Sequence, residues 1–271
     1  MPSIDQLQII NFRNLSEISL SLSRGVNLIY GSNGSGKTSL LEALYVLSSG
    51  KSFRSALVDP LIKDGELEAM VYVCTPENAR YGLRKRRHKK ALLRVNGENQ
   101  KNWDQVARAL PVLVIDSGAF ELLEGGPKIR RRFIDWGVFH VERGFEAIWR
   151  NFSRCLKQRN QVLKQRSTAV EVWDKELCRW GEQVDHRRSR YFYEYQGVLA
   201  DVCRLVMPGF RIDCSYLRGW PEDRDLLSQL ETDQSRDQDR GQTHRGPHRA
   251  CLLYTSPSPR DATLSRMPSS A

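Results

Sequence analysis

The sequence lacks any apolar run long enough to cross a membrane, which takes about 20 consecutive residues. Its densest apolar stretch, residues 110–115, has only the length of a strand. The first residues show neither the basic region nor the apolar region of a secretory signal. These absences favour a protein that is neither exported nor membrane-embedded, and we expect a cytoplasmic location.

Cysteine pairs with the spacing of a metal site or a redox motif are also missing. The six cysteines lie far apart, with no Cys-x-x-Cys and no Cys/His pairing at zinc spacing. A chain of 271 residues can bury a core without disulfides. We therefore expect reduced thiols.

The charge balance is basic. Lys and Arg number 42 against 32 Asp and Glu, which gives a net charge of +10, while 40% hydrophobic and 27% charged residues are ordinary for a globular protein. A basic balance favours a polyanionic partner, either nucleic acid or an anionic membrane surface. It is equally compatible with a basic protein that has no such partner, and the length allows one large or two modest domains.

The first half of the chain has the pattern of a mixed α/β region. Residues 4–12 and 18–30 contain short alternating or continuous apolar stretches, which predict strands. Leucines recur at helical spacing over residues 40–47, and Gly50 follows where a helix would end. Residues 67–95 read as a β meander, with turn signals at residues 76–78 and a tight turn at 96–97.

The second half changes to long helices. Apolar residues recur at helical spacing from about residue 139 to residue 206, with Arg and Lys on the opposite sides. Residues 232–246 are polar and predict an exposed loop. Residues 251–271 are rich in Ser and Pro and have neither a helical nor a strand period, so we interpret them as an unrelated tail.

One motif carries specific chemistry. Residues 31–38 read GSNGSGKT and match the phosphate-binding pattern G-x-x-x-x-G-K-[ST] between an apolar stretch and a helix. Glycines let the backbone turn its amides around an anion, the lysine reaches the β- and γ-phosphates, and the following helix points its positive end at them. We predict that ATP and Mg²⁺ bind here, with Thr38 contributing its hydroxyl to the metal; the binding residues are Gly31, Ser32, Asn33, Gly34, Ser35, Gly36, Lys37 and Thr38.

Further stretches resemble the RecF family within the SMC and RecF class of ABC-type ATPases. They keep a consistent order and spacing from about residue 4 to residue 250. The stretches are residues 12–15 (FRNL), 25–31 (GVNLIYG), 40–44 (LLEAL), 50–54 (GKSFR), 126–127 (GP) with 130–135 (RRRFID), and Thr243 with 246–250 (GPHRA).

The resemblance implies an α/β fold, namely an ABC-type P-loop ATPase head with a mixed sheet and an antiparallel β meander, plus a helical second lobe. On this basis we divide the chain into an ATP-binding head lobe over residues 1–137, a helical lobe that begins the return to the head over 138–250, and the tail over 251–271. It also implies that Arg13 and Asn14 lie near the nucleotide, although both can equally form an ordinary turn at a strand end.

The function that the resemblance implies is recombinational repair and replication-fork maintenance, with links to DNA damage and the SOS response. Such a protein binds single- and double-stranded DNA at gaps or junctions, forms an ATP-dependent homodimer when full length, and works with recombination-mediator proteins. It is a weak DNA-dependent ATPase and needs no membrane. The residues alone leave a small-molecule or nucleoside kinase and a transporter ATPase subunit as alternatives, and no guanine-binding N-K-x-D motif is present.

The family's catalytic carboxylates and LSxGQ signature helix would follow residue 250. Residues 113–116 (LVID) imitate a Walker B strand, but Ser117 follows Asp116 where a second acid is expected, and residues 22–25 imitate the signature ahead of the loop. We therefore expect a chain that is incomplete at its C-terminus and does not hydrolyse ATP. A divergent terminus is the alternative.

Two basic runs are candidates for DNA contact. Seven Lys and Arg residues lie within residues 80–90, and neutralising phosphates with such side chains gives salt-sensitive binding without sequence preference. We predict DNA contact through Arg84, Lys85, Arg86 and Arg87, against the alternative of a solvated charged face. The second run, Lys128 with residues 130–132, can instead be structural or sense the nucleotide, because Arg132 adjoins apolar residues.

Overall fold

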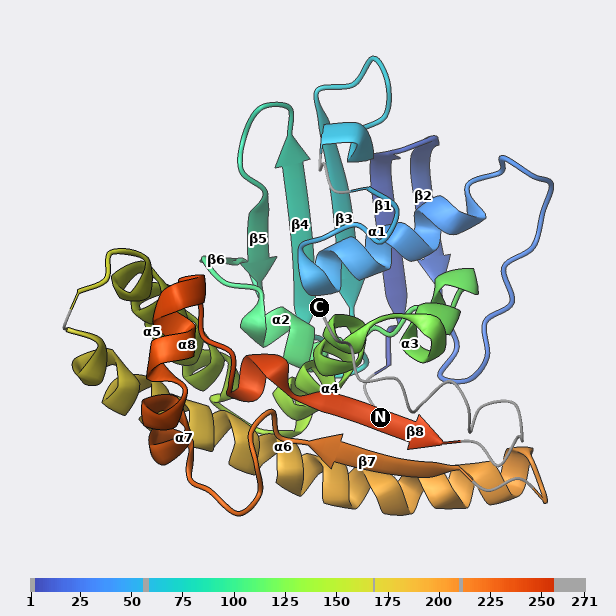
Figure 1. Ribbon diagram of the computed structural model, residues 1–271. Coiled ribbons are helices and arrows are strands. Elements are labelled where there is room, and N and C mark those ends of the chain that lie inside the picture. The colour runs from blue at the N-terminus through green and yellow to red at the C-terminus, as the bar shows by residue number, and fades with distance from the viewer. Residues whose placement is uncertain (1–2, 56–58, 168, 210–211, 256–271) are drawn as a thin grey trace. The chain divides into compact units, whose positions relative to one another are not determined.

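A computed structural model describes residues 3–55, 59–167, 169–209 and 212–255 (Figure 1). The chain divides into two compact units, Met1–Ile115 and Asp116–Ala271. This division falls 22 residues before the boundary at residue 137 that the sequence analysis placed. The first unit is mixed α/β and the second is mainly helical, and each is described by itself below.

The first unit is built on an antiparallel sheet with the strand order β2-β1-β3-β4-β5-β6. The predicted meander is confirmed: β3, β4 and β5 follow one another, and Asn96-Gly97 forms the turn into β6. The strands are β1 (Gln6–Phe12), β2 (Leu15–Ser21), β3 (Glu68–Cys74), β4 (Arg80–Arg86), β5 (Leu92–Val95) and β6 (Glu98–Gln100).

Helix α1 (Lys37–Ser49) covers one face of this sheet and lies across β1, β3 and β4 in Figure 1. Strand side chains alternate between the two faces, so every second residue points at the helix. Leu7, Ile9, Val71, Val73 and Leu83 are 5% exposed or less and form the core with the apolar side of α1. The predicted helix and its end at Gly50 are confirmed. The remaining elements are η1 (Asp59–Leu61) and α2 (Asp104–Ala109).

The strand predicted over residues 18–30 ends at Ser21, so the prediction is wrong for residues 22–30, which form no strand. Val26, Leu28 and Tyr30 are 95%, 82% and 86% exposed. A strand needs a neighbour to accept and donate its backbone hydrogen bonds, and the described residues offer this stretch none. The Walker-B-like stretch before Asp116 likewise forms no strand in the described part of the chain.

The second unit is organised around two long helices, α5 and α6, which pack along each other and confirm the helical lobe. Phe152, Leu163, Leu177 and Val184 on their facing sides are 1% exposed or less. The elements are η2 (Ser117–Phe120), α3 (Glu121–Glu124), α4 (Pro127–Val141), α5 (Phe145–Lys164), α6 (Val170–Val206), β7 (Asp213–Leu217), α7 (Leu226–Thr232), α8 (Gln234–Arg240), η3 (Pro247–Arg249) and β8 (Cys251–Thr255).

Two predictions for the second unit are wrong. Residues 232–246 are not an exposed loop, because they contain α8 and bury Asp237 and Thr243 to 0% and 1% exposure. Residues 251–255, which were expected to lack a strand as the start of the tail, form strand β8, which pairs with β7. The rest of that segment, residues 256–271, lies outside the described residues.

The six cysteines are unpaired. Among the described residues, no helix combines the length and the apolar character needed to span a bilayer.

Candidate nucleotide-binding site

The phosphate-binding loop leads directly into α1. Gly31, Gly34 and Gly36 have φ angles of 151°, 84° and 97°, a region that L side chains rarely adopt. At Gly36 the constraint is also steric, because a Cβ there would lie 2.2 Å from the Leu15 Cδ2 atom. The helix therefore begins immediately after a loop whose conformation depends on its glycines, and its free N–H groups open onto that loop.

Lys37 is folded back onto the loop that it serves. Its ammonium donates hydrogen bonds to the carbonyl oxygens of Gly31, at 2.8 Å, and Ser32, at 2.9 Å. This arrangement holds the charge over the centre of the loop. A bound phosphate would offer the ammonium charged acceptors, which form stronger hydrogen bonds than neutral carbonyls.

Asn14 ties the loop to the sheet. Its side-chain amide donates to the Gly34 carbonyl oxygen at 2.7 Å, and its side-chain oxygen accepts from the Ser39 hydroxyl at 2.7 Å. One residue in the turn between β1 and β2 thus fixes both the loop and the first turn of α1. The position agrees with the resemblance, which implied that residues 13 and 14 lie near the nucleotide.

Glu42 of α1 organises the charges beside the loop. It is fully buried, and both its oxygens accept from the Arg13 guanidinium, at 2.7 and 3.0 Å. The Ser52 hydroxyl donates to it at 2.5 Å, and Arg54 lies 3.6 Å away. Burial raises the pKa of Glu42, but the hydrogen bonds from Arg13 and Ser52 and the charges of Arg13 and Arg54 outweigh that effect, so the pKa lies below its usual value.

A cavity of about 1220 Å³ opens over the loop, large enough for a nucleotide. Besides the loop residues it is lined by cations from separate segments, and Asp64 is the one acid among its lining residues. The sequence analysis did not assign the cations Arg54, Lys63 and Arg87 to this site; the complete lining is Arg13, Asn14, Asn33, Gly34, Ser35, Gly36, Lys37, Thr38, Ser39, Arg54, Pro60, Ile62, Lys63, Asp64 and Arg87.

The cavity fits a nucleoside triphosphate with a divalent cation. Five cations face it, which suits three phosphates, and the exposed Thr38 hydroxyl is available as a metal ligand. The described residues contain no cluster of three or more His, Cys, Asp or Glu side chains that could hold a metal by themselves. A Mg²⁺ ion here would therefore take most of its ligands from phosphate and water.

The predicted DNA-contact run is divided by strand alternation. Arg84 and Arg86 are on the sheet face turned away from α1, and Arg86 pairs with Glu68 at 2.6 Å. Lys85 is on the α1 side beside the core, and Arg87 lines the nucleotide cavity. The four residues therefore do not form a single patch.

The second basic run is structural in two of its members. Arg130 of α4 donates to the carbonyl oxygens of Leu122, Leu123 and Gly125, and Arg131 donates to that of Ala250 at 2.7 Å. These bonds fasten α4 to the neighbouring chain segments of the second unit.

Asp116 serves as a helix cap, because its carboxylate accepts from the Gly118 N–H at 2.9 Å.

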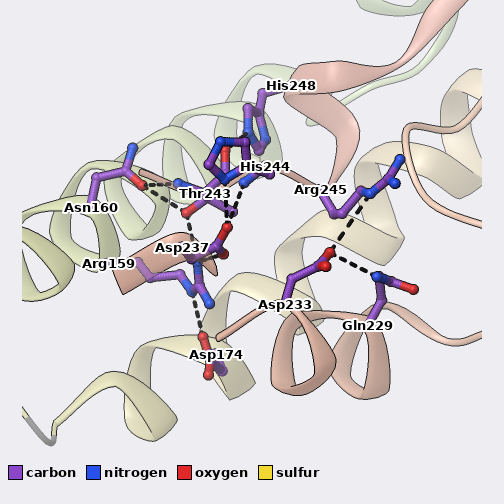
Figure 2. A network of polar contacts seen from close by, with 10 residues as sticks. All are labelled: Arg159, Asn160, Asp174, Gln229, Asp233, Asp237, Thr243, His244, Arg245 and His248. Atoms are coloured by element: carbon purple, nitrogen blue, oxygen red, sulfur yellow. Dashed lines mark hydrogen bonds and ion pairs between the residues drawn. The ribbon is translucent and has the colours of Figure 1, made fainter. Parts of the chain in front are cut away.

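The segment around Thr243 and His248 is buried in a polar network (Figure 2). Arg159 of α5 donates to Asp174 at 2.5 Å, to Asp237 at 2.6 Å and to the Thr243 hydroxyl at 2.9 Å. The His248 Nε2 atom lies 3.0 Å from the Thr243 carbonyl oxygen, and because a carbonyl only accepts, Nε2 carries a proton and donates it.

Burial in this network lowers the pKa of His248 to about 4, more than the Thr243 carbonyl raises it. Burial raises the pKa of Asp174, although Arg159 acts in the opposite direction. Through the hydrogen bonds of Arg159 to Asp174, Asp237 and Thr243, the network holds α5, α6, α8 and the Thr243 segment together within the second unit.

Comparison with known proteins identifies close relatives over most of the chain. A family model described as the RecF/RecN/SMC N terminal domain matches residues 3–129. The DNA replication and repair protein RecF of Shewanella halifaxensis is 42% identical over 256 residues, which cover 92% of this chain and 70% of the relative. The protein of the same name from Vibrio cholerae is 39% identical over 274 residues, covering 97% and 76%.

Solved structures agree on the fold. The structure of the recombination mediator protein RecF-ATP in the RecFOR pathway matches with a TM-score of 0.83 at 22% identity, covering 93% of this chain and 73% of that one. The corresponding RecF-ATPrS structure matches with a TM-score of 0.82 at 23% identity, covering 94% and 73%. The predicted head with a helical second lobe is thereby confirmed as the fold.

Proposed function

Because the chain belongs to the RecF family of DNA replication and repair proteins, we propose that it binds ATP at the loop ahead of α1 and uses the nucleotide to control its assembly on DNA. The single observation that carries this proposal is the glycine-dependent loop with Lys37 above it, set in a cavity lined by further cations. The RecF structures that share the fold are described with ATP and with ATPrS.

Binding exchanges the internal bonds of Lys37 for bonds to phosphate. The ammonium leaves the Gly31 and Ser32 carbonyl oxygens and donates to the β- and γ-phosphates, while the loop amides and the N-terminus of α1 receive the remaining oxygens. The Thr38 hydroxyl would hold a Mg²⁺ ion, which would supply positive charge to neutralise the phosphates. Asn14 keeps the loop in place during this exchange through its bond to Gly34.

Cations outside the loop line the same cavity and provide further contacts for the phosphates of the nucleotide. Arg13 is oriented by Glu42, and Arg54 is drawn toward the same carboxylate, so both guanidinium groups are positioned before ATP arrives. Lys63 and Arg87 line the same cavity from the chain segment around β3 and β4. Arg87 thus belongs with the nucleotide, whereas Arg84 and Arg86 remain proposed contacts for DNA phosphates.

We propose that DNA gaps or junctions are recognised by such phosphate contacts, that ATP promotes a homodimer of the full-length protein, and that recombination-mediator proteins join the assembly. A dimerisation switch uses ATP binding energy to change assembly, so it does not require rapid turnover. Linkage requires reciprocity: if ATP strengthens DNA binding, DNA must strengthen ATP binding by the same factor.

Fluorescent-ATP titrations with and without gapped DNA test this function. The expected result is tighter ATP binding in the presence of DNA, together with a matching increase in DNA affinity at saturating ATP. A small-molecule or nucleoside kinase, the alternative function, would show no such coupling. ATP affinity that is independent of every DNA form tested would contradict the proposed switch.

A further inference from the structure

The outer face of the first sheet, turned away from α1, carries a second cavity. It measures about 620 Å³ and lies over β3, β4 and β5. Three arginines line it, namely Arg80, Arg84 and Arg94, and its lining includes no acidic residue. Glu68, an acid on the neighbouring part of this face, is paired with Arg86. This cavity is separate from the nucleotide cavity and has no assigned ligand.

Its centre is a row of three residues across three strands. Tyr72 of β3 is opposite Gly82 of β4, which is opposite Arg94 of β5. Gly82 leaves the middle of this row without a side chain, and a Cβ added there would reach the Tyr72 ring only at 4.0 Å. Neighbouring strands lie about 4.8 Å apart, so the Tyr72 and Arg94 backbones are about 10 Å apart. The row therefore leaves space above Gly82, with the Tyr72 ring on one side and, on the other, the Arg94 side chain, whose Nε donates to Asn99 of β6 at 3.0 Å.

That gap has the size and chemistry of a slot for one unpaired base. A planar ring stacked on both sides needs about 3.5 Å on each side, or about 7 Å in all. Aromatic rings and guanidinium planes are the groups on which proteins stack unpaired bases. Arg80 and Arg84 flank the slot along β4, about 13 Å apart at 3.3 Å per residue, where phosphates on either side of the base would pass.

We propose that this cavity binds single-stranded nucleic acid, with one base stacked between Tyr72 and Arg94 and the flanking phosphates held by Arg80 and Arg84. The proposal rests on the proposed function as a DNA-binding protein and adds where an unpaired strand is held. Double-stranded DNA does not fit the slot, since its bases are stacked on one another and only its backbone could meet the arginines. The site thus separates the single-stranded side of a gap from its duplex side.

Filling the slot tests the proposal without removing core contacts. Gly82→Leu places a side chain between Tyr72 and Arg94, and Gly82 does not need a positive φ, so the fold should persist. Tyr72→Leu keeps an apolar side chain but removes the stacking ring. Tyr193→Leu is the matched control, since Tyr193 is 80% exposed on α6 of the second unit.

Each variant would be titrated by fluorescence anisotropy with labelled oligo(dT) and with a blunt duplex of the same length. We expect Gly82→Leu and Tyr72→Leu to bind oligo(dT) about 5- to 140-fold more weakly, the range of one lost base stack, while duplex binding and Tyr193→Leu match the wild type. Oligo(dT) that carries photoreactive 5-iododeoxyuridine should crosslink to Tyr72 in the wild-type protein.

Unchanged oligo(dT) affinity in both slot variants, with wild-type binding to DNA intact, would overturn the slot and leave the proposed function standing. An equal loss for oligo(dT) and duplex would also overturn it, because that result indicates phosphate contact without base stacking. A wild-type protein that binds no form of DNA would instead contradict the proposed function itself.

Discussion

Replacing the buried Glu42 by Gln should destabilise the first unit. The carboxylate is fully buried and holds Arg13 by two charge-assisted hydrogen bonds, of 2.7 and 3.0 Å. Glutamine keeps one acceptor oxygen but loses the charge and one of these bonds, each of which contributes about 1.5–3 kcal/mol. Breaking a fully buried pair costs about 3–5 kcal/mol. Arg13 and Arg54 retain 19% and 48% side-chain exposure, so water compensates in part.

We therefore expect Glu42→Gln to lower the free energy of unfolding by about 2–3 kcal/mol at pH 7. With a urea dependence of about 2 kcal/mol per molar, the midpoint falls by about 1 M. Hydrogen exchange of β1 and α1 peptides at increasing urea, followed by mass spectrometry, reports this unit separately from the second. Glu17→Gln is the matched control, because Glu17 is exposed on β2 and should change stability by less than about 0.5 kcal/mol.

The pH dependence supplies a second check. The folded-state pKa of Glu42 lies below its unfolded value, so the stability it contributes is present above about pH 4.5 and is lost as pH falls through the folded pKa. The difference between wild type and Glu42→Gln should accordingly shrink as the pH falls below about 4.5 and through the lower folded-state pKa. Equal midpoints at pH 7 would refute the reasoning that Glu42 and Arg13 stabilise the wall of the nucleotide site.

Three further predictions concern other contacts. The pKa of His248 is about 4 in the folded protein and about 6.5 in the unfolded chain, so the unfolded state binds more protons between these pH values. The free energy of unfolding of the second unit should therefore fall by up to about 3 kcal/mol as the pH drops from 6.5 to 4. His248→Phe should flatten this dependence when urea unfolding is measured at several pH values. Arg159→Met leaves two buried carboxylates without their cation and should cost about 3–5 kcal/mol in the same assay, whereas an unchanged midpoint would deny the network a stabilising role. The double variant Arg84→Gln with Arg86→Gln should reduce the slope of log affinity for duplex DNA against log salt by up to about 2, while Arg87→Gln should weaken ATP binding. Weaker ATP binding in the double variant together with a reduced DNA salt slope in Arg87→Gln would contradict the division of this run between two faces of the sheet.

Local sequence signals were sufficient to predict the phosphate loop, the β meander and the long helices. The glycines of the loop are required by their φ angles, and the helix that follows ends at Gly50 as its pattern indicates. The turns at Asn78 and Asn96 both have positive φ, which asparagine tolerates better than most residues. Each of these features is determined by residues within a few positions of one another.

The wrong or missing predictions concern segments whose structure depends on residues far away in the sequence. Residues 232–246 are as polar as a loop, yet Asp237 is buried because Arg159, 78 positions earlier, neutralises it. Residues 26–30 have strand composition, but a strand also requires a neighbour, which the described residues do not supply. The cations Arg54, Lys63 and Arg87 reach the nucleotide cavity from separate segments, and no local pattern relates them to the loop.

The central claim is that the loop ahead of α1 binds ATP through Lys37. Titration of fluorescent ATP with Mg²⁺ against the wild type, Lys37→Ala and the exposed control Lys51→Ala tests it most directly. A charge-assisted hydrogen bond contributes about 1.5–3 kcal/mol, so we predict about 10- to 150-fold weaker binding for Lys37→Ala and wild-type binding for Lys51→Ala. Equal affinity in all three proteins would contradict the account, because ATP would then be bound without the ammonium that the loop holds at its centre.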